Sequence, residues 1–179
     1  GAEDYVRLVV EKARKYYAEF GGIAPLKLFI NDFNLESDWD NNKKLASLIH
    51  WIGVWESDGK TKIDGIATQM HVSYYEDAKT QASKEAAIVK MFKDMAATNK
   101  LVKVSELDMG YVDATGAKVP AASMTEAQHQ AMAGFYTFII KAYLENVPAA
   151  QQYGITQWCI TDSAADSGWR AGEATGLWD

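Results

Sequence analysis

The chain has 179 residues, of which 48% are hydrophobic and 23% are charged, a length and balance that suit one globular domain with a sizeable core. Its formal net charge of −6, with no cluster of lysine and arginine, argues against a nucleic-acid-binding surface. The single cysteine, Cys159, excludes an internal disulfide framework and a CxxC metal site, and we expect neither a metal centre nor a cofactor. No apolar run is long enough to span a membrane, and residues 1–20 form a charged amphipathic pattern that differs from a signal peptide.

The first half of the chain alternates helical and extended patterns. Residues 3–20 carry apolar side chains at helical spacing with basic residues between them. A strand rich in apolar and aromatic residues follows at 27–32. Asp40 is placed to cap a helix that runs to about Trp55, and a second strand is predicted over 63–73.

The second half repeats this alternation. A helix is predicted over 78–97 and a strand over 101–108. The strongest helical pattern comes next, and Ser123 with Glu126 matches the capping box that opens such a helix. The last strand is predicted over 154–162, before an irregular tail.

Strands that alternate with helices at this spacing indicate an α/β fold with a parallel sheet and covering helices. An open doubly wound domain is one solution, and part of a (β/α)8 TIM barrel is another. The doubly wound domain explains the length more easily, because a complete barrel needs about 250 residues. The distribution of polar residues favours the barrel.

Every predicted strand ends in polar or aromatic side chains. Parallel α/β folds build their sites at the carboxyl ends of the strands, so we expect these side chains to converge on one face. Amides and carboxylates bind hydroxyl groups, indoles stack on pyranose rings, and cleavage at an anomeric carbon needs carboxylates. The mixture therefore favours a sugar-cleaving site, and the side chains concerned are Asn31, Asp32, Phe33 and Asn34; Gln69 and His71; Glu106 and Asp108; and Trp158, Thr161 and Asp162, with Trp169 and Arg170 just beyond.

The acidic pair on the third strand is the most informative of these features. Residues i and i+2 of a strand point to the same face, so Val104, Glu106 and Asp108 are expected on one side and Ser105 and Leu107 on the other. Burial of a carboxylate without a partner costs several kcal/mol or more. A lone strand glutamate is more often an ion-paired structural group than a nucleophile, and the agreement of four strand ends is what favours a site.

Four segments then carry a family resemblance. "KLFINDFNLE", "IDGIATQMHVS", "VKVSELDM" and "GITQWCITDSAADSGWR", in this order and spacing, resemble the second half of glycoside hydrolase family 10. Members of that family are (β/α)8 retaining endo-1,4-β-xylanases. The resemblance covers nearly the whole chain and implies that residues 1–179 are the C-terminal part of a single catalytic domain, strands five to eight of its barrel. It also implies a hydrolase of polysaccharide degradation that is secreted, periplasmic or attached to the cell surface.

The resemblance assigns roles to individual residues. Glu106 in "SELDM" matches the catalytic nucleophile of the family. His71 in "TQMH" matches the histidine that hydrogen-bonds the nucleophile, and Asp108 matches the acid that orients that histidine. The resemblance therefore gives the acidic pair on the third strand two different functions.

The substrate-binding residues are carried over in the same way. Gln69, Trp158 and Trp169 match residues on the side of the scissile bond that keeps the anomeric carbon, and Asn31 matches a polar residue at the rim. Phe33 stands where the family usually has a tyrosine on the leaving-group side, so the stacking face is kept and the hydroxyl is lost. The loop "DSAADSGWR" is longer than the usual form.

The family's general acid/base glutamate has no counterpart in this chain. It belongs to strand four, in an "NEA"-type motif that is absent here, and Glu36 lies one strand away from the required place. We therefore expect the chain to be a piece of a larger enzyme that acts on xylan or xylo-oligosaccharides together with the N-terminal half of the barrel. The alternative is a non-catalytic remnant that binds xylan or serves as a scaffold. No nucleic-acid or membrane partner is expected.

Overall fold

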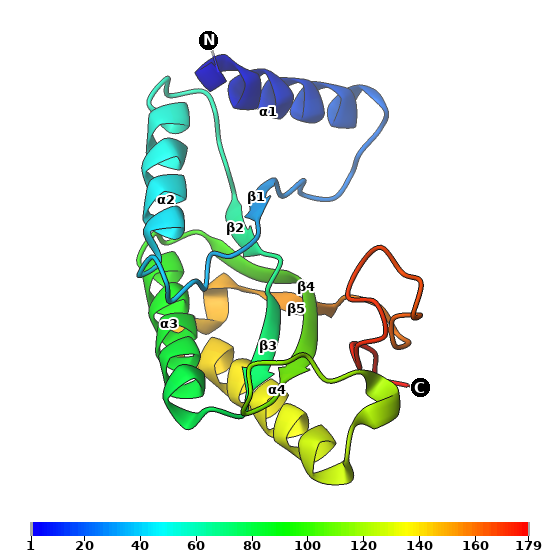
Figure 1. Ribbon diagram of the computed structural model, residues 1–179. Coiled ribbons are helices and arrows are strands. Elements are labelled where there is room, and N and C mark those ends of the chain that lie inside the picture. The colour runs from blue at the N-terminus through cyan, green and yellow to red at the C-terminus, as the bar shows by residue number, and fades with distance from the viewer. Residues whose placement is uncertain (1, 179) are drawn as a thin grey trace.

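The structure, a computed structural model, describes residues 2–178 and follows the predicted order of one helix, three strand–helix units, a last strand and an irregular tail (Figure 1). Within these residues, no helix is both long enough and apolar enough to cross a bilayer. The elements are α1 Ala2–Glu19, β1 Phe29–Asp32, α2 Lys43–Glu56, β2 Gly65–Thr68, β3 His71–Tyr75, α3 Ala78–Ala96, β4 Leu101–Val112, the 3-10 turn η1 Ala121–Ser123, α4 Glu126–Asn146, the 3-10 turn η2 Ala149–Gln151, and β5 Gln152–Gln157.

All strand pairs of the sheet are parallel, and with β2 and β3 counted as one strand, the strands lie side by side in chain order. The predicted strand 63–73 is divided into β2 and β3 at Met70, whose φ of 65° interrupts the extended backbone. Both parts pair with β4, so they act as one strand of the sheet. A doubly wound fold would reverse the strand order at a switch point. The sequential order therefore rules out the doubly wound alternative and agrees with part of a barrel.

Strand β4 contains one residue more than its neighbours along the middle of the sheet. On one side Thr68 lies opposite Val104 and His71 opposite Asp108, so three steps on β2–β3 match four on β4. On the side of β5, the register also shifts between Val104 and Leu107. This is a β-bulge at residues 105–106, a feature that is frequent next to active sites because it re-aims a side chain.

The bulge changes which side chains share a face. Val104 and Leu107 both lie in the buried core under the helices, whereas Ser105 and Glu106 both hydrogen-bond to Asn31 on the opposite side. The prediction that Val104 shares a face with Glu106 is therefore wrong, and so is the pairing of Ser105 with Leu107. An unbroken alternation cannot hold across the extra residue.

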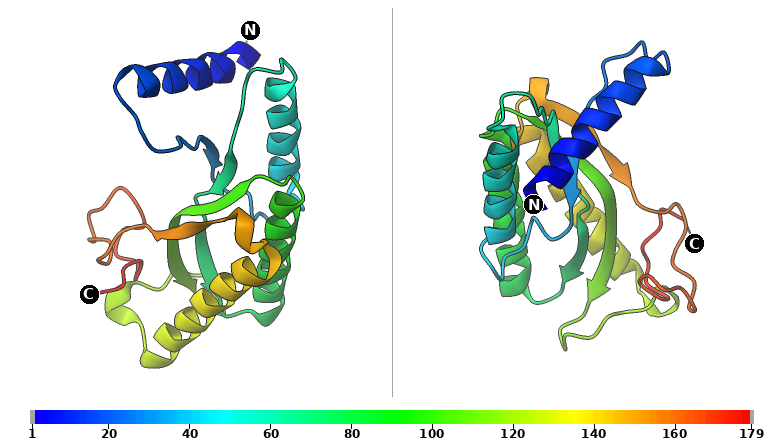
Figure 2. Two further views of the ribbon diagram at one scale, coloured as in Figure 1. Left: turned by 180° about the vertical axis from the view of Figure 1, so that it is seen from behind. Right: turned by 90° about the horizontal axis from the view of Figure 1, so that it is seen from above.

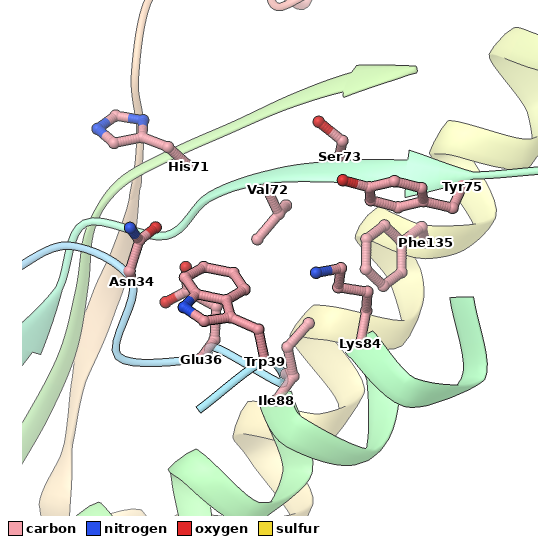
Figure 3. A pocket seen from close by; sticks show the side chains of 10 residues that line it. All are labelled: Asn34, Glu36, Trp39, His71, Val72, Ser73, Tyr75, Lys84, Ile88 and Phe135. Atoms are coloured by element: carbon pink, nitrogen blue, oxygen red, sulfur yellow. The ribbon is translucent and has the colours of Figure 1, made fainter. Parts of the chain in front are cut away.

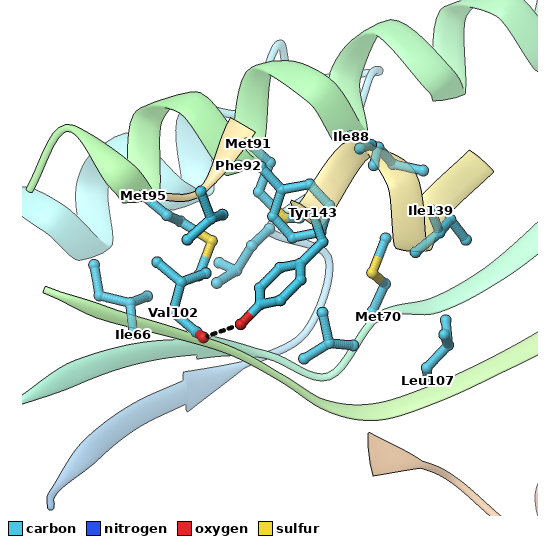
Figure 4. Close-up of a cluster of buried hydrophobic side chains, with 14 of the residues drawn as sticks. Ile66, Met70, Ile88, Met91, Phe92, Met95, Val102, Leu107, Ile139 and Tyr143 are labelled. Atoms are coloured by element: carbon cyan, nitrogen blue, oxygen red, sulfur yellow. Dashed lines mark hydrogen bonds between the residues drawn. The ribbon is translucent and has the colours of Figure 1, made fainter. Parts of the chain in front are cut away.

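Helices α2, α3 and α4 cover one face of the sheet, and the C-terminal tail lies on its other side (Figure 2). The core between sheet and helices is filled by Ile, Leu, Met and Phe side chains with few polar atoms (Figure 4). Tyr143 is the main exception. Its hydroxyl donates to the Val102 carbonyl at 2.9 Å and accepts from the Gly154 N–H at 3.1 Å, which ties α4 to β4 and β5.

Several predicted element ends differ from the structure; β4, for example, continues beyond the predicted residue 108 to Val112. Two of the differences show their local geometry clearly. Strand β5 ends at Gln157, because Cys159 adopts a left-handed φ of 62° that an extended strand excludes. Helix α2 begins at Lys43 and its N-cap residue is Asn42, two residues after the predicted cap at Asp40. The Asp40 carboxylate nevertheless accepts from the N–H groups of Lys43 at 3.3 Å and Lys44 at 3.2 Å. Asp40 thus satisfies free N–H groups of this helix from outside it.

The capping box of the last helix is shifted by two residues from its predicted place. Thr125 and Gln128 form it, while Ser123 belongs to the preceding 3-10 turn. Ser123–Glu126 and Thr125–Gln128 match the same sequence pattern, so the pattern alone does not separate them. The prediction of Ser123 and Glu126 is therefore wrong in position.

The two candidate caps differ in their expected effect on stability. Thr125→Ala removes the side-chain oxygen that accepts from the Gln128 N–H, so it should lower the free energy of unfolding by about 1 kcal/mol. Ser123→Ala is the matched control and should change it by less than about 0.5 kcal/mol. Urea unfolding of the protein that carries these residues measures both values. Equal losses in the two variants would contradict the observed cap.

Candidate active site

A cleft of about 730 Å³ opens at the carboxyl ends of the strands. Most of the predicted site residues line it, Asn31 contacts Glu106, and Asp108 lies behind His71. The structure thus gathers all the predicted catalytic and sugar-binding side chains in one place. The residues that line the cleft are Phe33, Asn34, Gln69, His71, Ser73, Glu106, Lys118, Trp158, Trp169 and Arg170.

Glu106 is held from two sides and remains open to the cleft. Asn31 Nδ2 donates to its Oε1 at 3.2 Å, and His71 Nε2 lies 3.4 Å from its Oε2. The Ser105 hydroxyl donates to Asn31 Oδ1 at 2.8 Å, which orients the amide so that its NH₂ group faces Glu106. The side chain of Glu106 keeps 24% exposure. The carboxylate is therefore both positioned and accessible.

The structure places His71 between the two carboxylates, the arrangement that the sequence predicts. Its Nδ1 lies 3.1 Å from Asp108 Oδ1, and the Asp108 side chain has no exposed surface. A carboxylate packed against one ring nitrogen restricts the orientation of an imidazole. The geometry suits a buried acid that acts on Glu106 through His71.

Aromatic side chains form the walls of the cleft. The Trp169 ring lies 4.6 Å from the His71 ring, and its Nε1 donates to Asp108 Oδ2 at 2.7 Å. Trp158 meets His71 edge-on at 6.2 Å. Phe33 stands at the other end, with Lys44 Nζ 3.6 Å from its ring centre. All three rings are about half exposed and offer apolar faces to a ligand.

Glu36 belongs to a smaller neighbouring pocket of about 140 Å³, which Asn34, His71 and Ser73 share with the main cleft (Figure 3). Its side chain is buried and accepts from the Thr68 hydroxyl at 3.0 Å. Burial raises the pKa of the Glu36 carboxyl, and the hydrogen bond from Thr68 with the charges of His71 and Lys44 opposes that shift only in part. Glu36 therefore does not line the cleft that exposes Glu106.

The comparison with known protein families decides the classification. All residues of the chain, 1–179, match the model of glycosyl hydrolase family 10. The chain belongs to glycosyl hydrolase family 10.

Individual relatives agree with this family. The endo-β-1,4-xylanase Xyn10C of Cellvibrio japonicus is 32% identical over 139 residues, which cover 76% of this chain and 21% of that protein. Among solved structures, xylanase B of Clostridium stercorarium F9 matches with a TM-score of 0.70 at 19% identity, over 98% of this chain and 48% of the other. Xylanase A of P. fluorescens subsp. cellulosa, solved with xylopentaose, matches with a TM-score of 0.66 at 25% identity, over 97% and 50%.

The fold is thus the α/β fold of the family's TIM barrels, and the chain spans about half of the two solved xylanases named above. It spans about a fifth of the curated relative Xyn10C. Within residues 2–178, no three His, Cys, Asp or Glu side chains gather closely enough to hold a metal ion.

Sequence reasoning missed the places of two residues in the site. Arg170 was expected only as a polar residue beyond the last strand, and the structure places its guanidinium against Asp108. Lys118, from the loop after β4, also reaches the cleft without having been predicted. Both lie on irregular segments, where no periodic pattern indicates which way a side chain points.

The raised pKa of Glu36 gives stability a defined pH dependence. The folded state keeps this proton to higher pH than the unfolded chain does, so Glu36 lowers the free energy of unfolding as pH rises from about 4.5 through the raised folded value. Glu36→Gln removes that loss and keeps an acceptor for Thr68. The stability gain of the variant over the wild type should therefore be larger at pH 8 than at pH 4, by about 1.4 kcal/mol per unit of pKa shift. Urea unfolding at both pH values tests this, and an equal difference at the two would refute it.

Proposed function

We propose that residues 1–179 form the C-terminal part of the catalytic barrel of a retaining endo-1,4-β-xylanase, strands five to eight, with Glu106 as its nucleophile. The observation that carries this proposal is the position of Glu106. It is an accessible carboxylate, held by Asn31 and His71, in a cleft walled by indole rings. Membership of glycosyl hydrolase family 10 supports the same reaction class.

The reaction follows from this geometry. One Glu106 oxygen attacks the anomeric carbon and forms an ester, while the bond from that carbon to the leaving-group oxygen breaks. The leaving oxygen takes a proton from a general acid, a role that we assign to none of the cleft residues within 2–178. Water then attacks the same carbon and gives its proton to the group that served as the general acid; the ester bond breaks, Glu106 is freed as a carboxylate, and the two inversions give net retention. Asp108 orients His71, and His71 with Asn31 aims the carboxylate.

The aromatic and amide side chains would bind the xylan chain. Gln69, Trp158 and Trp169 would hold the sugar that becomes attached to Glu106, and Phe33 would stack on the leaving-group side. A polymeric substrate also supports a secreted, periplasmic or cell-surface enzyme, because xylan does not enter cells. The xylopentaose complex of xylanase A from P. fluorescens subsp. cellulosa supports the ligand class.

The N-terminal half of the barrel is the partner that this proposal requires. Within residues 2–178, strand β1 pairs only with β2, and β5 pairs only with β4, so the sheet has two open edges. Open parallel edges are unfavourable in isolation and are removed when a barrel closes. A largely apolar cleft of about 800 Å³ lies beside β5 and α4, with Ile140, Leu144 and Tyr153 exposed. We propose that the missing half covers these surfaces and supplies the acid/base glutamate.

Covalent trapping tests the assignment of Glu106. An activated 2-fluoro-xyloside with a dinitrophenolate leaving group needs no proton from a general acid, so it should label the protein with one sugar residue per chain. Intact mass spectrometry and peptide mapping should place the label on Glu106, and Glu106→Gln should abolish it. Labelling of another residue, or unchanged labelling in the variant, would contradict the proposal. A protein that binds xylo-oligosaccharides and takes no label would support the non-catalytic alternative.

His71→Ala tests the proposed support of the nucleophile. The variant loses a group on which the charge of Glu106 depends during attack, so kcat on an aryl β-xylobioside should fall about 10–100-fold. KM should change by less than about threefold, because Trp158 and Gln69 still bind the sugar. Steady-state kinetics on the complete protein separate the two. A loss confined to KM would instead make His71 a substrate-binding residue.

A further inference from the structure

A line of alternating charges continues behind the proposed catalytic groups towards the surface. Arg170 Nε lies 3.1 Å from Asp108 Oδ1, and Arg170 Nη1 donates to Glu173 Oε2 at 2.9 Å. Lys118 Nζ then donates to Glu173 Oε1 at 2.7 Å. The side chains of Arg170 and Glu173 are only 10% and 5% exposed, whereas Lys118 is 67% exposed. The charges therefore run from Glu106 through His71 and Asp108 to the solvent.

The guanidinium of Arg170 is fixed by several independent contacts. Its Nη2 donates to the Val72 carbonyl at 2.6 Å and its Nη1 to the Ser73 hydroxyl at 3.4 Å, both on the strand that carries His71. Arg170 adopts a φ of 47°, a left-handed conformation that costs energy for a residue with a Cβ. The tail backbone is therefore strained at Arg170, the same residue whose guanidinium pairs with Asp108.

Gly110 leaves the room that this ion pair needs. A Cβ at this position would lie 2.1 Å from Glu173 Oε2 and 2.5 Å from Arg170 Nη1. Both distances are far below contact, so any other residue would displace the pair. The missing side chain of Gly110 therefore makes the space that Arg170 and Glu173 occupy beside the sheet.

We propose that Arg170 is a positioning residue for the reaction: it compensates the buried charge of Asp108 and holds that carboxylate in place beside His71, which in turn contacts Glu106. The inference rests on the proposed nucleophilic role of Glu106. The Asp108 side chain has no exposed surface, so its burial needs a compensating charge, and Arg170 is a cation 3.1 Å from its Oδ1. Without that cation, the Asp108 carboxylate would lose a contact that fixes it beside His71, and His71 would be less firmly placed against Glu106.

The electrostatic consequence has a definite sign. Loss of the Arg170 charge makes proton binding by the coupled catalytic groups more favourable, so the acid limb of the pH profile of kcat/KM should move to higher pH. Loss of the Glu173 charge acts in the opposite direction and more weakly, because Glu173 is one step further from His71. Charged groups face His71 from several elements. Glu36 from the loop after β1 and Lys84 from α3 share the smaller pocket with it. Glu106 and Asp108 from β4 contact its ring, Lys118 and Arg170 line the main cleft with it, and Glu173 pairs with both of these cations.

The experiment compares Arg170→Met with the wild type in the complete protein, on 2,4-dinitrophenyl β-xylobioside. We expect kcat to fall about 10–100-fold with KM within about threefold. We also expect the acid limb to rise by about one pH unit. Arg170→Lys keeps the charge but not the fork of donors, so it should recover most of the pH profile and only part of kcat. Arg14→Met is the matched control, because Arg14 pairs with the buried Asp64 at 2.8 Å on the other end of the sheet, and its kinetics should equal those of the wild type.

A second variant covers the case in which Arg170→Met does not fold. Glu173→Gln should fold, and it should move the acid limb to lower pH. If folded Arg170→Met has wild-type kinetics and an unchanged acid limb of the kcat/KM pH profile, the inference is overturned. It is also overturned if only KM is impaired, because Arg170 would then serve only to hold the tail in place. If only Glu173→Gln can be measured, an acid limb of its kcat/KM pH profile that stays in place or moves to higher pH overturns the inference. An inactive wild type, or an active Glu106→Gln, would instead refute the proposed function itself.

Discussion

An unbroken β4 strand would turn Val104 and Glu106 to the same side of the sheet, and the extra residue between them prevents this. Val104 and Leu107 can therefore both face the helices, while Glu106 and Asp108 both face the cleft side. A bulge leaves backbone groups without their ladder partners. The single Ser105 O–H compensates in part, because it is shared between the Asn31 amide oxygen at 2.8 Å and the Thr68 carbonyl at 3.1 Å. The residue at the bulge therefore also orients Glu106 through Asn31.

The burial of Asp108 connects this strand to the irregular tail. A buried carboxylate needs donors and a compensating charge, and β3 provides only the His71 imidazole. The tail provides the rest, through the Trp169 indole N–H and the Arg170 guanidinium. Trp169 thereby has two functions, since its ring also walls the cleft. The contacts of Trp169 and Arg170 with Asp108 therefore hold the tail against the sheet, and they also position the Trp169 ring in the wall of the cleft.

Sequence could predict the elements and the convergence of their ends, because both follow from residue type, periodicity and the rule that parallel strands end on one edge. It could not predict the bulge, since "KVSELDM" alternates equally well with or without an extra residue. It could not choose between Ser123 and Thr125 as a cap, because both begin the same motif and the 3-10 turn before Thr125 decides. Arg170 lay outside any periodic segment, so its contact with Asp108 depended on the path of the tail.

The proposed function divides the chemistry between two parts of the barrel, because the groups that compensate the charges of Glu106 and Asp108 lie on the part that this chain forms. Every partner of Glu106 and Asp108 found in the structure belongs to this chain: Asn31, His71, Trp169 and Arg170. Under the proposed function, these residues position Glu106 and Asp108, whereas protonation of the leaving group depends on the N-terminal half of the barrel. Nucleophilic attack and proton donation then depend on different parts of the barrel. The open edges of β1 and β5 are where those parts would meet, so closure of the barrel would control the proton-dependent step while leaving the support of Glu106 unchanged.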